Sequence, residues 1–259
     1  MMNNFMINLI EEKFSSLISD QKLAISDEPF LIENFIDIKK YISSENILND
    51  AINSDSVFWD IYDTAGPKLE IPFKRPYWSP TKQQHKLFIM EAINAGCTYV
   101  ILKCSTLNEK LKRLTVAIQN CFHTTADIHV YGSKGKGGSF IVHADLPANF
   151  ILQLEGETQW IVFNNKVSSV LSMADVLQKK MKFHLEGFNL EDFKQNKGLE
   201  PIINKTLKPG DLLYIPSRYY HCALPSSPRM SLSIPCVNTE ILDADDLSGR
   251  QMDLNIYKF

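Results

Sequence analysis

The chain has 259 residues, of which 44% are hydrophobic and 10% aromatic, so it can bury a sizeable core. Its formal net charge is −3, which excludes a globally basic protein of the kind that binds nucleic acid through its overall charge. We expect no membrane segment, because no apolar run reaches the roughly 18 residues that a span needs.

The cysteines favour a reducing compartment. The chain has five of them, an odd number, and none forms a C-x-x-C pair. Residues 1–13 include Glu11 and Glu12 and lack the basic start of a signal peptide. We therefore predict free thiols and a cytoplasmic location.

Residues 1–90 are predicted to form a helical region followed by an extended connector. Apolar residues recur at helical spacing up to about residue 55. Between residues 60 and 80, a Gly-Pro pair and three further prolines argue against a helix. A helical pattern returns over residues 82–95, and Gly96 follows it at a plausible C-cap position.

The pattern then becomes mainly β. One more amphipathic helix is predicted over residues 108–121. Short β-like runs occupy residues 98–102, 128–131, 139–163 with a turn at Gly156, 212–215 and 229–236. Residues 165–205 are interpreted as a helical insertion between these runs, and residues 238–259 as a C-terminal tail. Residues 132–138 are rich in glycine and lysine and are predicted to be a loop at the mouth of a site.

Three residues in the β-like part have the chemistry of a metal site. His143 and Asp145 are two positions apart, so both face the same side of a strand. His221 follows 78 residues later, and antiparallel pairing could bring it opposite the first two. Two imidazoles and one carboxylate are the ligand set of a non-haem Fe(II) centre. By spacing alone a metal site and three ordinary structural residues remain about equally plausible. The other histidines of this region, His123 and His129, have no matching partner and are interpreted as structural.

These motifs, taken together, resemble the JmjC/cupin-type oxygenases that depend on Fe(II) and 2-oxoglutarate. The resemblance covers roughly residues 95–236 and is closest to the branch of ribosomal protein hydroxylases. It is carried by His143-Ala-Asp145, by Phe150-Ile-Leu-Gln-Leu-Glu-Gly156 with Trp160, and by Pro209-Gly-Asp-Leu-Leu-Tyr-Ile-Pro216 with His221. It implies a mainly β fold with flanking helices, in which residues 91–237 form a double-stranded β-helix, or jelly roll.

The resemblance also implies roles for single residues. His143, Asp145 and His221 match the iron ligands of the family. Tyr131 and Asn149 match positions that contact the cosubstrate, 2-oxoglutarate.

One position departs from the family pattern. Fifteen residues after the first histidine the family has Lys or Arg, which pairs with the distal carboxylate of 2-oxoglutarate, whereas this chain has Thr158. A hydroxyl supplies no charge, and a buried dicarboxylate without a cation is costly. Arg229 is the best substitute, because an Arg-x-Ser pair after the distal histidine serves many other 2-oxoglutarate oxygenases. Ser231 lies two positions further on the same strand face and is expected to donate a further hydrogen bond to the carboxylate, with Thr158 as another residue of the cosubstrate site. The alternative is that Arg229 is a surface residue after a turn.

The resulting hypothesis is a Fe(II)- and 2-oxoglutarate-dependent dioxygenase that hydroxylates a C–H bond on a protein or peptide side chain. Only 38 residues follow His221, too few for the winged-helix domain of ribosomal hydroxylases, which weakens a ribosomal substrate. The alternatives are a small-molecule hydroxylase, an iron oxygenase that does not use 2-oxoglutarate, and a non-catalytic cupin-like binding or dimerisation module. Homodimers are common in the family, but no residue pattern here demonstrates one.

Overall fold

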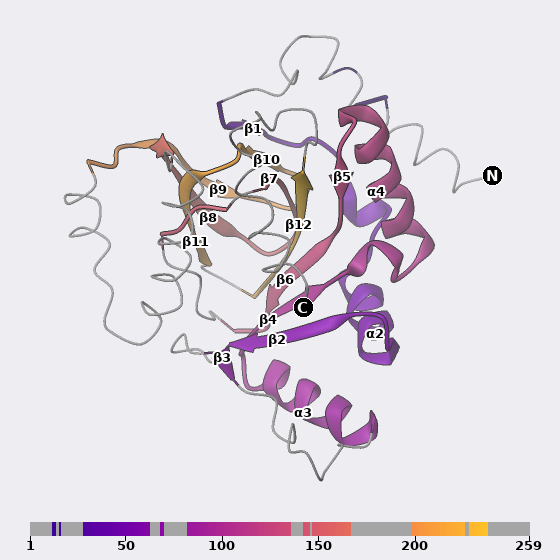
Figure 1. Cartoon of the computed structure of the whole chain (residues 1–259). Coiled ribbons are helices and arrows are strands. Elements are labelled where there is room, and N and C mark those ends of the chain that lie inside the picture. Colours follow the sequence, from indigo (N-terminus) through magenta and orange to yellow (C-terminus); the bar gives the residue numbers. More distant parts are fainter. Residues whose placement is uncertain are drawn as a thin grey trace, which may run out of the picture.

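The computed structural model describes residues 12–13, 16, 28–62, 68–69, 82–135, 142–145, 147–166, 198–225 and 228–237. Two antiparallel sheets and three α-helices account for most of these residues (Figure 1). One face of the larger sheet is covered by the helices, and its other face is turned toward the smaller sheet.

The larger sheet has nine strands in the order β1-β10-β7-β12-β6-β4-β2-β3, with β5 also paired to β12. All its printed neighbours are antiparallel. Its strands are β1 (Phe30–Ile32), β2 (Phe58–Tyr62), β3 (Lys68–Leu69), β4 (Thr98–Leu102), β5 (Thr125–Ala126), β6 (His129–Ser133), β7 (Ala148–Glu155), β10 (Leu212–Ile215) and β12 (Arg229–Val237).

The smaller sheet has the order β11-β8-β9 and comprises β8 (Thr158–Lys166), β9 (Pro201–Leu207) and β11 (Tyr219–Pro225). Gly156, with φ +63°, makes the turn between β7 and β8 and so carries the chain from one sheet to the other. Ile151 and Leu213 of the larger sheet pack against Val162 and Leu207 of the smaller one. These contacts hold the two sheets face to face around an interior that both of them line.

The main core lies between the larger sheet and the helices α2 (Ser44–Asn53), α3 (Lys82–Asn94) and α4 (Glu109–Phe122). Side chains alternate along β7, so Phe150, Leu152 and Leu154 face this main core. The residues between them face the smaller sheet. The inward face of β7 therefore carries the polar Asn149 and Gln153 on either side of the apolar Ile151. Short 3-10 turns precede α2 at Ile38–Lys40 and α4 at Cys104–Thr106.

The prediction for residues 1–90 was incomplete. The helix α2 and the start of α3 lie in this range, as expected, but β1, β2 and β3 belong to the larger sheet. The segment before α2 also packs closely on the β domain at Gly210, which has φ +98°. A β-carbon at residue 210 would lie 2.4 Å from the carbonyl oxygen of Ile36. The reason for the miss is that β1 and β3 have only three and two residues, too short to show a period. The division at residue 91 therefore stays a proposal about chain segments, since the sheet crosses it.

Other predictions for elements are confirmed or lie outside the described residues. The helices over residues 82–95 and 108–121 and the strands over 98–102, 128–131, 212–215 and 229–236 are present with small shifts at their ends. The end of the predicted insertion, residues 201–205, is strand β9 instead of helix. Its predicted helices, the glycine-rich loop beyond residue 135 and the C-terminal tail lie outside the described residues.

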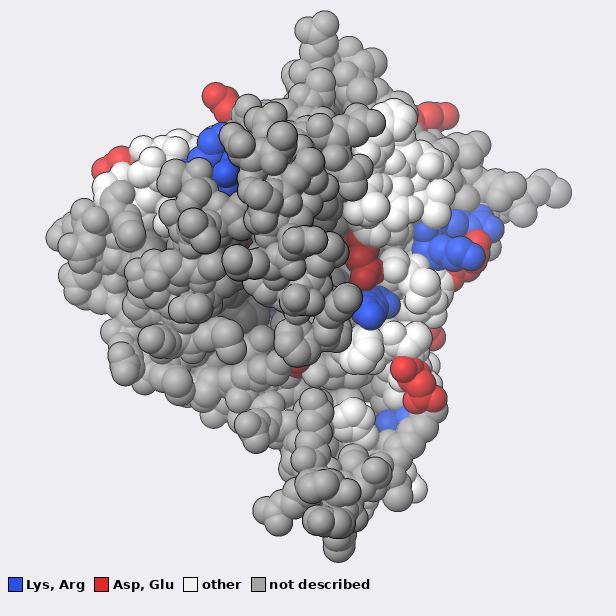
Figure 2. Space-filling view, in the orientation of Figure 1, with Lys and Arg blue, Asp and Glu red and all other residues white. Residues whose placement is uncertain are grey.

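The described surface has mixed charge on the face shown in Figure 2, where acidic and basic side chains are scattered instead of forming one basic field. This agrees with the expectation from net charge. Within the described part of the chain, no helix combines the length and apolar character that crossing a membrane requires. The five cysteines are all free thiols, and four of them are buried.

Candidate metal centre

The backbone brings the two histidines together. His143 forms an isolated antiparallel bridge with His221, in which the amide of each donates to the carbonyl of the other over 3.0 Å and 2.7 Å. Asp145 follows two residues later, and its carbonyl accepts from the amide of Arg218 over 2.7 Å. Both sides of the candidate site are thus fixed by main-chain hydrogen bonds before any side chain is considered.

His221 follows the strand that ends at Ile215, as expected, and it lies within a further strand of its own. It belongs to β11, which pairs with β8 so that His221 is opposite Val162. The prediction missed β11 because Tyr219–Pro225 has no clear alternation of apolar and polar residues. Since Val162 contributes to the core between the sheets, His221 also faces that interior.

Hydrogen bonding orients the ring of His221. Its Nδ1 lies 2.8 Å from the carbonyl oxygen of Tyr219, an acceptor, so Nδ1 carries the proton. The other nitrogen, Nε2, then presents its lone pair 3.6 Å from a carboxylate oxygen of Asp145. A backbone carbonyl that fixes the tautomer in this way is typical of metal-binding histidines.

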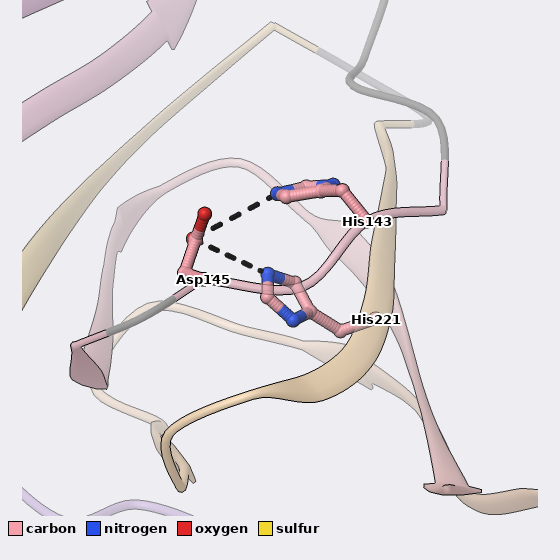
Figure 3. Close-up of side chains that lie close together, drawn as sticks. All are labelled: His143, Asp145 and His221. Carbon is pink, nitrogen blue, oxygen red and sulfur yellow. Dashed lines mark ion pairs between the residues drawn. The ribbon is translucent and has the colours of Figure 1, made fainter. Parts of the chain in front are cut away.

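The three side chains converge on one point (Figure 3). Nε2 of His143 is 3.8 Å from the same oxygen of Asp145, and one ligand atom from each residue lies within 4.8 Å of the others. The two histidines are nearly buried, whereas about a third of the Asp145 side chain is exposed. Two imidazole nitrogens and one carboxylate on one side of a point are the donor set that non-haem iron uses, so the residues fit such a metal.

The predicted cosubstrate residues occupy inward-facing strand positions. Ser231 of β12 lies between Gln153 of β7 and Tyr131 of β6 in the register of the larger sheet. Arg229 is two positions from Ser231 and shares its face. Asn149 lies four positions before Gln153 on the same face of β7, and its side-chain oxygen accepts from the hydroxyl of Ser233 over 3.0 Å.

Arg229 is a buried cation, not a surface residue. It is 6% exposed, and burial lowers its pKa to about 10, so it stays protonated at neutral pH. Its Nε has no hydrogen-bond partner among the described residues. No described carboxylate forms an ion pair with it. Buried charges are normally paired, so this guanidinium is suited to an anion that enters the interior.

The charges of Arg229 and of the candidate metal ligand Asp145 both influence Tyr131. Burial and then the nearby carboxylate of Asp145 raise the pKa of Tyr131, and the charge of Arg229 opposes them. The phenol is therefore within electrostatic reach of both charged groups.

Thr158 is fully buried and takes part in a hydrogen-bonded chain. The side-chain nitrogen of Gln153 lies 3.3 Å from its hydroxyl oxygen. The hydroxyl of Ser231 donates to the side-chain oxygen of the same Gln153 over 2.8 Å. Gln153, for which the sequence predicted no role, thus bridges Thr158 and Ser231, which are both predicted to contact the cosubstrate.

Three interior residues were missed. Gln153 and Trp160 stand within motifs that carried the family resemblance, which was the available signal. The indole nitrogen of Trp160 is buried without a partner among the described residues, and its ring centroid lies 6.0 Å from that of His221. His129, interpreted as structural, pairs in register with Ser233 on the interior face, and burial lowers its pKa.

Arg218 stands at the edge of the site in an unusual conformation. Its φ is +70°, in the left-handed region that non-glycine residues seldom occupy. The bond from its amide to the carbonyl of Asp145 holds it there. Such strain occurs preferentially at functional sites, and here it fixes the backbone next to a metal-binding carboxylate.

Comparison with protein families gives one match over this region. The family model described as "JmjC domain" matches residues 102–243, which is more than half of the chain and includes all three metal-binding residues. The predicted resemblance to JmjC oxygenases is thereby confirmed.

Curated relatives match with low identity. A protein of Dictyostelium discoideum named "Bifunctional lysine-specific demethylase and histidyl-hydroxylase NO66" is 26% identical over 230 residues, which cover 83% of this chain and 42% of the relative. A protein of the same name from Drosophila grimshawi is 31% identical over 139 residues, covering 54% of this chain and 17% of the relative. The chain therefore spans less than half the length of these relatives.

Solved structures are similar in fold. The X-ray structure of Escherichia coli ycfD has a TM-score of 0.51 at 19% identity, covering 90% of this chain and 57% of the other. A second structure, titled "YcfD, a Ribosomal oxygenase from Escherichia coli", also has a TM-score of 0.51, at 18% identity, and covers 88% of this chain and 52% of the other. At this identity the likeness concerns the fold, and it confirms the predicted jelly roll with flanking helices.

Proposed function

The chain belongs to the JmjC domain family, and from this premise we propose that it is a dioxygenase that uses Fe(II) and 2-oxoglutarate to hydroxylate a C–H bond. The observation that carries the proposal is the pairing of two features in one interior. One feature is the His-Asp-His donor set, and the other is the buried cation of Arg229, whose Nε has no partner among the described residues. The charges of Asp145 and Arg229 both act on Tyr131. A dicarboxylate that also binds metal would satisfy both features.

Metal binding in this proposal falls to His143, Asp145 and His221. These residues would supply three ligand atoms to the ion, and a non-haem iron site with three protein ligands keeps positions open for a cosubstrate and O₂. When bound, the iron with 2-oxoglutarate and O₂ supplies the oxidising chemistry, with succinate and CO₂ as co-products. The protein orients these ligands through the bond from His221 to Tyr219 and the backbone bridge between the histidines.

Cosubstrate binding falls to residues around Arg229. The guanidinium offers parallel donors that match a carboxylate, and in a buried site such a bond is worth more than in water. Tyr131 pairs with Ser231 in the sheet and is influenced by the charges of both Arg229 and Asp145, and Asn149 lies on the same face of the larger sheet. This arrangement supplies the cation that Thr158 does not.

The substrate that we propose is a side chain on a protein or peptide. The curated relatives are named as a lysine demethylase and histidyl-hydroxylase, and a structure of similar fold is titled a ribosomal oxygenase. These names favour a macromolecular substrate over a small molecule. The cytoplasmic location and a homodimer remain predictions, which fractionation and sedimentation would test.

The decisive experiment measures 2-oxoglutarate binding directly. The wild type and Arg229→Met, each loaded with Mn(II) to prevent turnover, are titrated with 2-oxoglutarate in a calorimeter. We expect Arg229→Met to weaken binding at least about thirtyfold, because truncating one partner of a buried charge pair costs about 2–5 kcal/mol. Arg113→Met, which changes a partly exposed arginine of α4 outside the site, is the matched control and should retain affinity.

The outcomes separate the alternatives. A wild type that binds no Mn(II) or Fe(II) would overturn the enzyme proposal in favour of a cupin-like binding module. Metal binding without affinity for 2-oxoglutarate would indicate an iron oxygenase of another kind. Equal affinity of the wild type and Arg229→Met would refute Arg229 as the anchor. With Fe(II) under air, succinate release that depends on His143 and Asp145 would support the complete proposal.

A further inference from the structure

Gln153 is held rigidly at the centre of the interior wall. Its side chain is fully buried, and it lies opposite Ser231 in the pairing of β7 with β12. Its amide donates to the carbonyl of Asp211 over 3.1 Å, and its carbonyl accepts from the amide of Gly210 over 2.9 Å. The side chain therefore starts from a backbone that is fixed on both sides of the peptide unit.

The orientation of the Gln153 side-chain amide follows from its neighbours. One of its two terminal atoms lies 2.9 Å from the carbonyl oxygen of Glu155 and 3.4 Å from that of Gly156. Both neighbours can only accept hydrogen bonds, so the atom facing them is the nitrogen, Nε2. The oxygen, Oε1, must then face Ser231. This orientation of the Gln153 amide follows from Glu155 and Gly156 alone and does not use the hydroxyls of Ser231 or Thr158.

This orientation determines which hydroxyl keeps a free hydrogen. Ser231 has one hydroxyl hydrogen and donates it to Oε1 of Gln153, 2.8 Å away. Thr158 has the opposite role, because its oxygen accepts from Nε2 of Gln153 over 3.3 Å. The hydrogen of Thr158 remains available, since the described residues give it no acceptor although its side chain is fully buried.

Thr158 and Arg229 both occupy inward-facing strand positions, one on each of the two facing sheets. Val162 of β8 packs in the core between the sheets. Thr158 and Trp160 lie four and two positions before it, so they share its inward face. Arg229 and Ser231 share the inward face of β12. The chain Ser231–Gln153–Thr158 therefore crosses from the larger sheet to the smaller one, starting two strand positions from Arg229.

We propose that Gln153 is a positioning residue that commits the hydroxyl hydrogen of Ser231 to itself and reserves that of Thr158 for the distal carboxylate of 2-oxoglutarate. The inference rests on the proposed function, because it assumes that this cosubstrate is the anion of Arg229. It revises the expectation that Ser231 donates to the carboxylate. A carboxylate accepts only, so it needs a hydroxyl with a free hydrogen, and Thr158 has one. Accepting a bond from Gln153 also strengthens Thr158 as a donor.

The first experiment compares the two hydroxyls. Wild type, Thr158→Val, Thr158→Ser and Ser231→Ala, all loaded with Mn(II), are titrated with 2-oxoglutarate, and their folding is checked by thermal unfolding. We expect Thr158→Val to weaken binding about tenfold or more, as the loss of a hydrogen bond to a charged group does. Thr158→Ser should bind within about threefold of the wild type, because it restores the donor. Ser231→Ala should lose less than Thr158→Val.

The second experiment tests positioning by Gln153. In Gln153→Met the hydrogen of Ser231 is released and becomes able to reach the carboxylate. Removing Ser231 in that background should therefore weaken binding by about tenfold, a larger factor than Ser231→Ala gives alone. A merely structural role of Gln153 would leave the effect of Ser231→Ala the same in both backgrounds.

The outcomes are distinguishable from failure of the proposed function. If the wild type does not bind 2-oxoglutarate, the function itself is wrong. If it binds and Ser231→Ala loses affinity while Thr158→Val does not, the function stands and this inference is overturned. Equal effects of Ser231→Ala with and without Gln153 would also overturn it.

Discussion

Arg229 is a residue whose buried position is unfavourable for stability and suited to binding an anion. Arg229 is charged and buried, its Nε has no partner among the described residues, and no described carboxylate pairs with it. Replacing a poorly compensated buried charge with an apolar residue of similar length is often stabilising. Residues that bind a ligand tolerate such costs because the ligand offsets them.

We therefore expect Arg229→Met to raise the free energy of unfolding of the ligand-free protein by about 1 kcal/mol or more. Urea denaturation of the wild type and the variant, both without metal, measures the difference. Arg113→Met is a suitable control, because Arg113 is a partly exposed residue of α4 that pairs with Glu109. A clear loss of stability in Arg229→Met would mean that the guanidinium serves the fold instead of a ligand.

At the level of elements, the helices stabilise the site by packing on the outer face of the larger sheet. Leu111, Leu114 and Ile118 of α4 are buried in the main core. The ring of Phe122 meets that of Phe150 on β7 at a centroid distance of 4.9 Å. Because β7 carries Gln153 and Asn149 on its other face, the position of α4 bears on the interior wall.

The N-cap of α4 also connects two helices. The side-chain oxygen of Asn108 accepts from the amide of Leu111 over 3.1 Å, and its nitrogen donates to Asp50 of α2 over 2.9 Å. We expect Asn108→Ala to cost about 1–2 kcal/mol in urea denaturation, because both bonds are lost. Asn108→Ser keeps the cap alone and should fall between Asn108→Ala and the wild type. Equal stability of all three would show that the cap contributes nothing.

Sequence patterns identified most elements but not all. The helix at α4 and the strand β4 follow from regular apolar spacing over more than one period. The short strands β1 and β3 and the pattern-poor β11 do not, because their pairing partners decide their conformation. The consequence for the site is that the strand carrying His221 was not identified, although its role as a candidate ligand and its antiparallel approach to His143 were predicted.

For the whole molecule, metal binding should couple to folding. His143 and Asp145 lie on one segment and His221 on β11, so an ion held by all three would join two parts of the chain that meet only in the folded state. A ligand that binds only the folded state at 100 times its Kd adds about 2.7 kcal/mol of stability. We expect the Tm to rise as Co(II) is added.

The control for this experiment is Asp145→Asn, which removes one charged ligand and preserves the size of the side chain. It should show a smaller rise in Tm at the same Co(II) concentration, because an amide is a poorer ligand than a carboxylate. An equal rise in both proteins would place the ion elsewhere and contradict the proposed centre.

The sequence by itself determined the chemistry of the proposed centre. His143, Asp145 and His221 were selected from residue types and spacing, because two positions along a strand share a face whatever the fold, and Arg229 was selected through the resemblance to 2-oxoglutarate oxygenases. Only the tertiary structure decided how strands from the two sheets face one another. It buried Arg229 and placed Gln153 between Ser231 and Thr158. The direction of those hydrogen bonds depends on two backbone carbonyls, and no spacing along the chain encodes it.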